Sequence, residues 1–136
     1  MPVRYFSPEG LMQPVPYHHV AVGTGSQQIH VSGQIARSAD GTPVAPGDLA
    51  GQMVQALRNT AVGLAAAGAT FSDVLRLKFY LKDWAPEMYP DFMAGLQRAA
   101  VEVGLSLPAP PLSAIGVSYL FEPDVLVEVE AYAVVG

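Results

Sequence analysis

Two glutamates near the end of the chain, Glu128 and Glu130, are best placed by type and spacing to do chemistry. They belong to a predicted strand over residues 125–134, in which alternate side chains point to opposite faces of a sheet. The two carboxylates therefore share a face and lie roughly 7 Å apart. The simpler interpretation, which the residues alone favour, is a solvated face with salt bridges to Arg76 and Lys78.

The alternative is a carboxylate pair that is removed from water. Four flanking residues are too apolar for an open sheet edge. They are Val125, Leu126, Val134 and Val135. If a second subunit covers this face, the carboxylates must be paired or their pKa values must shift. A buried carboxylate with a raised pKa is suited to general acid–base chemistry, so this alternative predicts proton transfer.

A second polar cluster lies in a predicted strand over residues 28–33. His30 and Ser32 share one face of this strand, and Gly33 leaves its backbone open to close approach by a ligand. Taken alone, the cluster is better explained as a strand that ends at a turn. A functional interpretation of this cluster requires other functional residues to lie beside it in the fold.

Several classes of chemistry find no support in the sequence. The chain has three histidines without metal-ligand spacing and no cysteine, which leaves no thiol nucleophile, disulfide or cysteine zinc site. It has no GxSxG motif, and no GxGxxG motif opens a helix. The GTGS segment at residues 23–26 lacks the lysine and the following helix of a P-loop. We therefore expect no metal and no cofactor.

Charge and hydropathy limit the partners. The net charge is −5, and seven Lys and Arg residues form no basic stripe, so we expect no nucleic acid. The longest apolar runs are far shorter than the ~20 residues that span a bilayer, and no apolar signal segment is visible, so we expect no membrane. With the absence of cysteine, these features predict a cytoplasmic protein.

The chain is poor in charge for its size. Only 14% of its 136 residues are charged, whereas about 25% is typical of soluble domains. Apolar residues make up 51%. Because small domains have much surface for their volume, they need more polar cover rather than less. Either the fold buries both faces of its sheet, or a partner covers part of the surface.

Two helices are indicated by apolar residues at three- and four-residue spacing. The first follows Asp48, whose carboxylate can cap it, and ends before Gly68, which suits a left-handed C-terminal position. We expect its interior glycines, Gly51 and Gly63, to allow close approach to a neighbouring element. The second helix begins near Pro90.

Strands complete the order ββαβαββ behind a short edge strand. They are predicted over residues 3–6, 19–23, 28–33, 73–83, 114–120 and 125–134. We expect the strands at 19–23 and 28–33 to form a hairpin, and Leu75, Leu77 and Phe79 to share one face. Two helices against one sheet predict a single α+β domain over residues 1–136, with the other sheet face uncovered by its own chain.

Separate segments of the chain resemble the Rid family, the reactive-intermediate deaminases, also called YjgF or endoribonuclease L-PSP proteins. The segments are Pro16-Tyr17, Val31-Ser32-Gly33-Gln34, Ala66-Ala67-Gly68-Ala69, Asp73-Val74 and Leu126-Val127-Glu128-Val129-Glu130-Ala131. The resemblance covers nearly the whole chain. It implies a chorismate-mutase-like fold, a homotrimer with small-molecule clefts between subunits, and cofactor-independent hydrolysis of enamines or imines to a keto acid and ammonia.

The resemblance also implies roles for single residues. Glu128 occupies the place of the carboxylate that positions or activates water, and Glu130 and Arg76 are further candidates. The cleft would be lined by Tyr17, Ser32, Gly33, Tyr89, Leu112 and Ala114. His19 is a candidate proton shuttle because its ordinary pKa is near neutrality, although its ring could equally cap a strand.

One position departs from the family pattern. An arginine that binds the substrate carboxylate is expected sixteen residues before the glutamate, where this chain has Leu112. Loss of such a charge-assisted contact costs about 1.5–3 kcal/mol of binding, so we expect a poor 2-aminoacrylate deaminase. Two alternatives stay open: a non-catalytic protein that binds a metabolite in the same clefts, and a ribonuclease, which the net charge disfavours.

Overall fold

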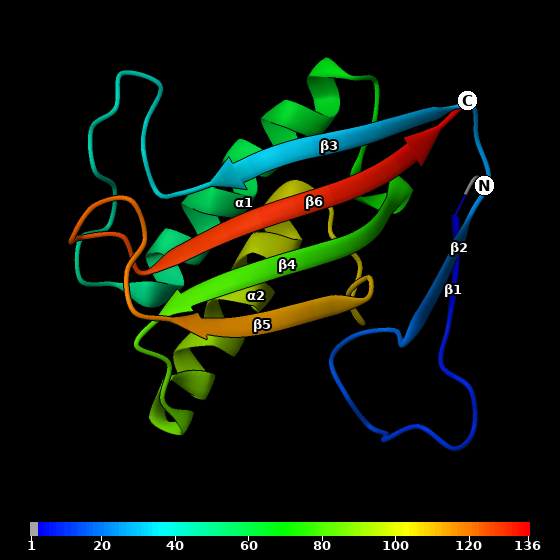
Figure 1. Cartoon of the computed structure of the whole chain (residues 1–136), viewed down its shortest axis with the longest axis horizontal. Coiled ribbons are helices and arrows are strands. Elements are labelled where there is room, and N and C mark those ends of the chain that lie inside the picture. Colours follow the sequence, from blue (N-terminus) through cyan, green and yellow to red (C-terminus); the bar gives the residue numbers. More distant parts are fainter. Residues whose placement is uncertain (1–2) are drawn as a thin grey trace.

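Two helices pack on one face of a four-stranded sheet, and a two-stranded sheet lies at one end (Figure 1). This computed structural model describes residues 3–136, so the first two residues of the predicted domain lie outside the described range. The helices are α1 (Leu49–Ala66) and α2 (Tyr89–Val103). The strands are β1 (Val3–Phe6), β2 (Val20–Gly23), β3 (Gln27–Gln34), β4 (Val74–Lys82), β5 (Leu112–Val117) and β6 (Val127–Val135). The predicted α+β order is confirmed.

The large sheet is mixed, with both parallel and antiparallel strand pairs. Its strand order is β3-β6-β4-β5, with β6 in a central position (Figure 1). Strand β6 runs antiparallel to both β3 and β4, whereas β5 runs parallel to β4. A parallel pair needs a crossover connection between its strands, and α2 supplies it. Strand β5 thus forms one edge of the sheet, directly after the long loop that follows α2.

The predicted hairpin between β2 and β3 is wrong. Strand β2 pairs with β1 in the small sheet, with Val3 opposite Gly23, whereas β3 pairs with β6. The physical reason is burial: pairing with β6 sets Val31 opposite Ala131, and both side chains enter the core. A tight hairpin with β2 would leave the long apolar strand β6 without a partner on that edge.

The core lies between the helices and one face of the large sheet. On β6, Val127, Val129 and Ala131 are buried, whereas Glu128 and Glu130 are half-buried on the opposite face, as the alternation predicted. Each fully buried aliphatic side chain contributes about 1.5–3 kcal/mol through loss of contact with water. The chemistry-bearing glutamates are therefore held in place by the buried residues between them.

The signals at the ends of α1 are confirmed. The Asp48 carboxylate accepts a hydrogen bond of 3.0 Å from the N–H of Gly51, and Gly68 has a φ of +79°. Gly63 lies on the core side of the helix, where an added Cβ atom would be 2.9 Å from Cγ1 of Val31. The predicted close approach to a neighbouring element is thus present at Gly63.

Strand β4 departs from the predicted alternation at Leu75. The register with β6 shifts between Val74 and Arg76, and this irregularity lets Val74 fill the core. Leu75 packs instead beside β2, since a Cβ atom added to Gly23 would lie 2.6 Å from its Cδ2. From Leu77 onwards the alternation is as predicted.

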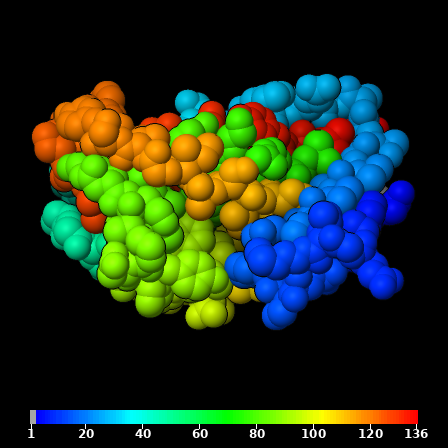
Figure 2. All heavy atoms as spheres, turned by 60° about the horizontal axis from the view of Figure 1, so that its bottom comes forward, coloured from blue at the N-terminus to red at the C-terminus, as the bar shows by residue number. Residues whose placement is uncertain are grey.

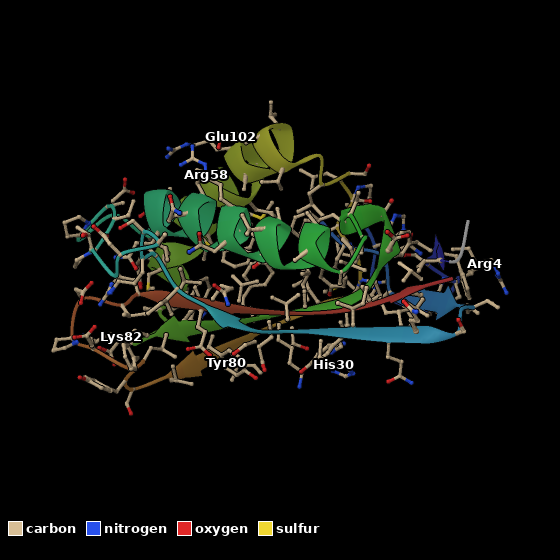
Figure 3. The ribbon with its side chains drawn as sticks, turned by 90° about the horizontal axis from the view of Figure 1, so that it is seen from above. Arg4, His30, Arg58, Tyr80, Lys82 and Glu102 are labelled. Carbon is tan, nitrogen blue, oxygen red and sulfur yellow. The ribbon has the colours of Figure 1, made fainter. Side chains whose placement is uncertain are left out.

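The other face of the large sheet carries no helix, and we call it the open face. Figure 3 shows Tyr80 and His30 on this side, pointing away from the helices. Its central side chains are polar and half-buried: Arg76, Lys78, Tyr80, Glu128, Glu130 and Tyr132. Within residues 3–136, no helix combines the length and the hydropathy needed to cross a bilayer.

Candidate functional site

The Glu128 carboxylate lies against the backbone of Gly33 on the neighbouring strand. A Cβ atom added to Gly33 would lie 2.6 Å from Cδ of Glu128 and would overlap with its Oε2 atom. The register between β3 and β6 shifts between Val31 and Gln34, so Gly33 lies in an irregular stretch of strand. The sequence predicted that Gly33 would allow close approach by a ligand. In the structure, the group that approaches it is the side chain of Glu128.

The environment of Glu128 disfavours its charge. Within residues 3–136, this carboxylate takes part in no ion pair and no side-chain hydrogen bond. Partial burial, and next the nearby charge of Glu130, raise the pKa of the Glu128 carboxyl above its ordinary value. A carboxyl group with a raised pKa and free oxygens can accept a proton from water and return it to a substrate.

Glu130 has a partner, which is Tyr80 on β4. The Tyr80 hydroxyl donates a hydrogen bond to Oε1 of Glu130, and the two side chains lie on the open face. This hydrogen bond, with burial as the second cause, raises the pKa of Tyr80 to about 12. Tyr80 therefore stays protonated and acts as the hydrogen-bond donor to Glu130.

The predicted salt bridges from the glutamates to Arg76 and Lys78 are not formed. Arg76 donates instead to the hydroxyl of Ser113 on β5. The Lys78 ammonium lies 5.7 Å from the ring centroid of Tyr132, at a cation–π distance. Both cations remain on the open face, but neither neutralises the carboxylate pair.

His30 and Ser32 share the exposed side of β3, as predicted. The His30 ring packs edge-on against Tyr132 with 5.2 Å between centroids. Ser32 is exposed beside Gly33, and Glu128 lies across from the same stretch of β3. The open face thus gathers the predicted site residues Ser32, Gly33 and Glu128.

Four of the predicted site residues line a separate cavity of about 380 Å³. They are Tyr17, Tyr89, Leu112 and Ala114. In Figure 2, the blue N-terminal loop, the orange strand β5 and the yellow-green start of α2 meet on the face turned to the viewer. These three segments, together with Trp84 after β4, supply the cavity walls.

The two groups lie on opposite faces of the sheet. Leu112 pairs with Leu77, and Ala114 pairs with Phe79, whose side chains enter the core on the helix side. Glu128 pairs with Tyr80 on the open face. Because paired residues in adjacent strands point to the same side, one chain does not bring Leu112 and Glu128 together.

His19 anchors the N-terminal loop. Its ring Nε2 donates a hydrogen bond of 2.7 Å to the carbonyl oxygen of Met12, and its backbone N–H donates to the Ser7 hydroxyl. The ring also packs edge-on against Tyr17, 5.2 Å between centroids. The acceptor Met12 lies in the loop between β1 and β2, so the ring fastens this loop rather than the end of a strand, and the contact holds Tyr17 at the cavity. Its neighbour His18 stacks on Tyr5, 5.3 Å between centroids.

Five residues that line the cavity were not predicted as site residues from the sequence: Met12, Val15, Pro16, Trp84 and Phe92. Trp84 is the only tryptophan of the chain and directly follows β4, which is a signal that could have been used. Phe92 lies on the buried side of α2, and it serves both the core and the cavity wall. Within residues 3–136, no three His, Asp or Glu side chains gather closely enough to hold a metal ion.

Comparison with protein families gives one model, described as endoribonuclease L-PSP, which matches residues 11–135. A comparison with curated proteins gives no significant match.

Solved structures similar to this chain include members of one conserved group. A Yersinia pestis protein, YyfB, described as a protein of unknown function of the conserved Rid family, shares 33% identity with a TM-score of 0.87. The match covers 99% of this chain and 100% of that one. Escherichia coli TdcF with bound serine shares 26% identity (TM-score 0.68, 96% and 94% covered). The E. coli YjgF gene product shares 28% identity (TM-score 0.67, 96% and 92% covered).

Proposed function

Because this chain belongs to the Rid family, which the endoribonuclease L-PSP model describes, we propose that it hydrolyses the enamine or imine form of a small metabolite. The products are a carbonyl compound and ammonia. The observation that carries this proposal is Glu128, whose unpaired carboxylate with a raised pKa lies fixed against Gly33 on the open face. The same site also fits a coarser description, a metabolite-binding cleft.

The reaction needs only water and proton transfer. An enamine first gains a proton on carbon and becomes an iminium ion, C=N bearing hydrogen on nitrogen. Water then adds to the carbon, a C–O bond forms, and the C=N π electrons move to nitrogen. Glu128 accepts the proton that water loses and returns it to nitrogen. The C–N bond then breaks, ammonia leaves, and loss of the hydroxyl proton gives the carbonyl product.

We extend the proposal to a homotrimer in which clefts between subunits complete the site. Three observations support it. The open face holds partly buried carboxylates but has no cover from its own chain. The second group, with Tyr17 and Leu112, lies on the opposite side of the sheet, so a neighbouring copy must bring it to Glu128. The low charge content of the chain is a third sign of covered surface.

The Glu128→Gln variant tests the proposed role of the carboxylate. The amide keeps the shape but cannot accept a proton, so we expect the rate of ammonia release to fall about 10²–10⁴-fold. Burial disfavours the ionised carboxylate in the folded state, so the variant should be at least as stable as the parent at neutral pH. The matched control is Glu102→Gln, which removes only an exposed ion pair with Arg58 and should leave the rate unchanged.

Leu112, at the position where the family pattern has an arginine, narrows the range of substrates that we expect. Within the cavity beside Leu112, no charged side chain lines the wall, which supports weak binding of a substrate carboxylate there. We expect slow release of ammonia from freshly generated 2-iminopropionate. Turnover equal to that of a Rid protein with the arginine would contradict this part of the proposal.

A non-catalytic binding protein is the second candidate, favoured by the apolar character of the cavity. TdcF, one of the similar proteins, has been seen with bound serine. Ligand binding that survives in Glu128→Gln, together with no turnover of any imine by the parent protein, would support this candidate. We place either activity in the cytoplasm. The net charge of −5 disfavours a ribonuclease, which stays the least favoured alternative.

A further inference from the structure

The cavity beside Leu112 is lined without charge. Its walls are Met12, Val15, Pro16, Tyr17, Trp84, Tyr89, Phe92, Leu112 and Ala114. Its volume of about 380 Å³ lies in the range of small-molecule sites. A carboxylate that entered would lose hydration and find neither a cation nor a built anion site. The lining therefore discriminates against charge and offers mostly aromatic and aliphatic surface.

The aromatic wall is braced from the core. Phe92 is buried and packs edge-on against Phe79, with 5.2 Å between ring centroids. Trp84 in turn packs edge-on against Phe92 at 6.2 Å. Such edge-to-face pairs fix the ring planes, so the cavity presents a preformed surface for a flat group.

The preceding residue Asp83 and the neighbouring strand β5 also support the position of Trp84. Asp83, which precedes it, has a φ of +50°, and its N–H donates a 2.7 Å hydrogen bond to the carbonyl of Val117. On β5, a Cβ atom added to Gly116 would lie 3.2 Å from Cβ of Trp84. The backbone and the Cβ atom of Trp84 are therefore held beside strand β5, and the indole packs against Phe92.

Two polar groups remain available to a ligand. Within residues 3–136, the hydroxyls of Tyr17 and Tyr89 form no hydrogen bond with protein atoms. Tyr17 is held at the cavity by its contact with His19, whereas Tyr89 is exposed at the start of α2. Neutral hydroxyls can orient a carbonyl, hydroxyl or amide but do not replace a guanidinium as a partner for a carboxylate.

We propose that the substrate of this protein carries an uncharged aromatic or similarly flat apolar group, which binds in the cavity formed by Trp84, Phe92 and Leu112. The inference rests on the proposed function for the reaction, but not for the binding preference. The C=N bond lies outside the cavity, where a neighbouring copy presents Glu128. An apolar group gains free energy by leaving water, and offset contact with aromatic rings adds to that gain.

Binding is measured with the sole tryptophan as the reporter. Trp84 lines the cavity, so its fluorescence should respond to occupancy without any label. The full chain is titrated with 2-phenylacetamide, which is neutral and aromatic, with phenylacetate, which is charged and aromatic, and with acetamide, which is neutral and small. We expect 2-phenylacetamide to bind at least about tenfold more tightly than either of the other two.

Two variants test whether the cavity sets this preference. Leu112→Arg places a cation in the wall and should reverse the order, so that phenylacetate binds more tightly than 2-phenylacetamide. The matched control is Val101→Arg, which adds the same charge at an exposed position of α2 away from the cavity. It should keep the parent order. Equal affinity for the three probes, or no response to any of them, would overturn the inference.

A turnover arm separates this inference from the proposed function. Imines are generated freshly from 2-phenylethylamine and, as 2-iminopropionate, from alanine. Faster hydrolysis of the aromatic imine agrees with both proposals. Binding preference without any turnover would contradict only the hydrolase. Turnover that is equal for both imines, or faster for 2-iminopropionate, would contradict only the substrate class.

Discussion

Glu128 is held by the shape of its surroundings rather than by a partner. Its oxygens overlap the space that a side chain at position 33 would fill, so a glycine there is a condition for the observed geometry. The same placement takes the carboxylate partly out of water, which raises its pKa. One residue choice therefore fixes both the position and the basicity of the group that we assign to proton transfer.

Replacement of Gly33 by alanine should remove the activity of the site while the protein stays folded. The new Cβ atom must displace the end of the flexible Glu128 side chain, which moves more easily than the backbone. We expect ammonia release to fall to the level of Glu128→Gln, while thermal unfolding shows a folded protein. In the double variant, the loss should be no larger than in Glu128→Gln alone, because both changes remove the same group. Multiplied losses would show that Gly33 acts separately.

The pH profile should report the neighbouring charge. The rate depends on ionised Glu128, so kcat/KM should fall as pH decreases through its raised pKa. Glu130→Gln removes the negative charge that contributes to this shift, so the acid limb should move to lower pH. It should not reach the position of an ordinary glutamate, because burial is the larger cause and remains. An unchanged acid limb would contradict the assignment to Glu128.

At the residue scale, the strand period of two was enough to put Glu128 and Glu130 on one face. It could not choose their partners, because Arg76, Lys78 and Tyr80 all share the facing strand. Tyr80 pairs with Glu130, whereas Arg76 turns to Ser113. Which side chain pairs with each glutamate depends on the register between strands and on competing acceptors. Neither can be deduced from the local sequence pattern.

At the element scale, the two helices approach closely at Gly95, a position that the sequence did not single out. An added Cβ atom would lie 2.6 Å from Cβ of Met53 and 3.0 Å from Cα of Ala50 on α1. Both neighbours are part of a rigid helix, so α1 and α2 would have to separate. Packing of α2 also sets the position of Phe92 and Tyr89 at the cavity.

Gly95→Ala should therefore destabilise the fold in spite of its better helix propensity. Alanine is favoured over glycine by about 1 kcal/mol inside a helix, but forcing a methyl group into a packed interface costs about 1–3 kcal/mol. We expect a lower free energy of unfolding in urea. Ala94→Gly, on the exposed side of the same helix, measures the propensity difference alone. A net gain for Gly95→Ala would show that the helices can move apart freely.

Element types were predictable where local signals were strong. Capping by Asp48 and termination at Gly68 are local properties of the chain, and both ends of α1 followed from them. The pairing partner of β3 could not be predicted from local signals. The turn-like segment at 23–26 is compatible with a hairpin as well as with a passage between two sheets. Burial of Val31 against the central strand β6 determines the pairing of β3, and this burial depends on a contact between residues far apart in the sequence.

At the scale of the whole molecule, the open face is the feature that one chain cannot account for. Helices cover only one side of the sheet (Figure 3). The other side carries half-buried polar groups, and Ile115 on the edge strand β5 is exposed. In the homotrimer that we propose, a neighbouring copy would cover this face and unite the two groups of site residues. Its arrangement cannot be deduced from a single sequence, because it depends on complementarity between surfaces.

Ile115→Asp should weaken the proposed assembly. A charge on the edge strand would lose hydration on association without gaining a partner. Light scattering of the parent should give about three times the chain mass of 14.4 kDa, and the variant should shift towards that single-chain mass. Val62→Asp, on an exposed position of α1, is the matched control and should leave the mass unchanged. A monomeric parent would contradict the trimer.

The separation of Glu128 from the aromatic cavity has a genetic consequence. In the proposed assembly, each complete site draws its carboxylate from one chain and its cavity from another. We expect a chain with Glu128→Gln and a chain with Tyr89→Ala each to lose activity alone, whereas a mixed assembly of the two would contain some intact sites. Two defective alleles expressed in one cell would thus complement each other.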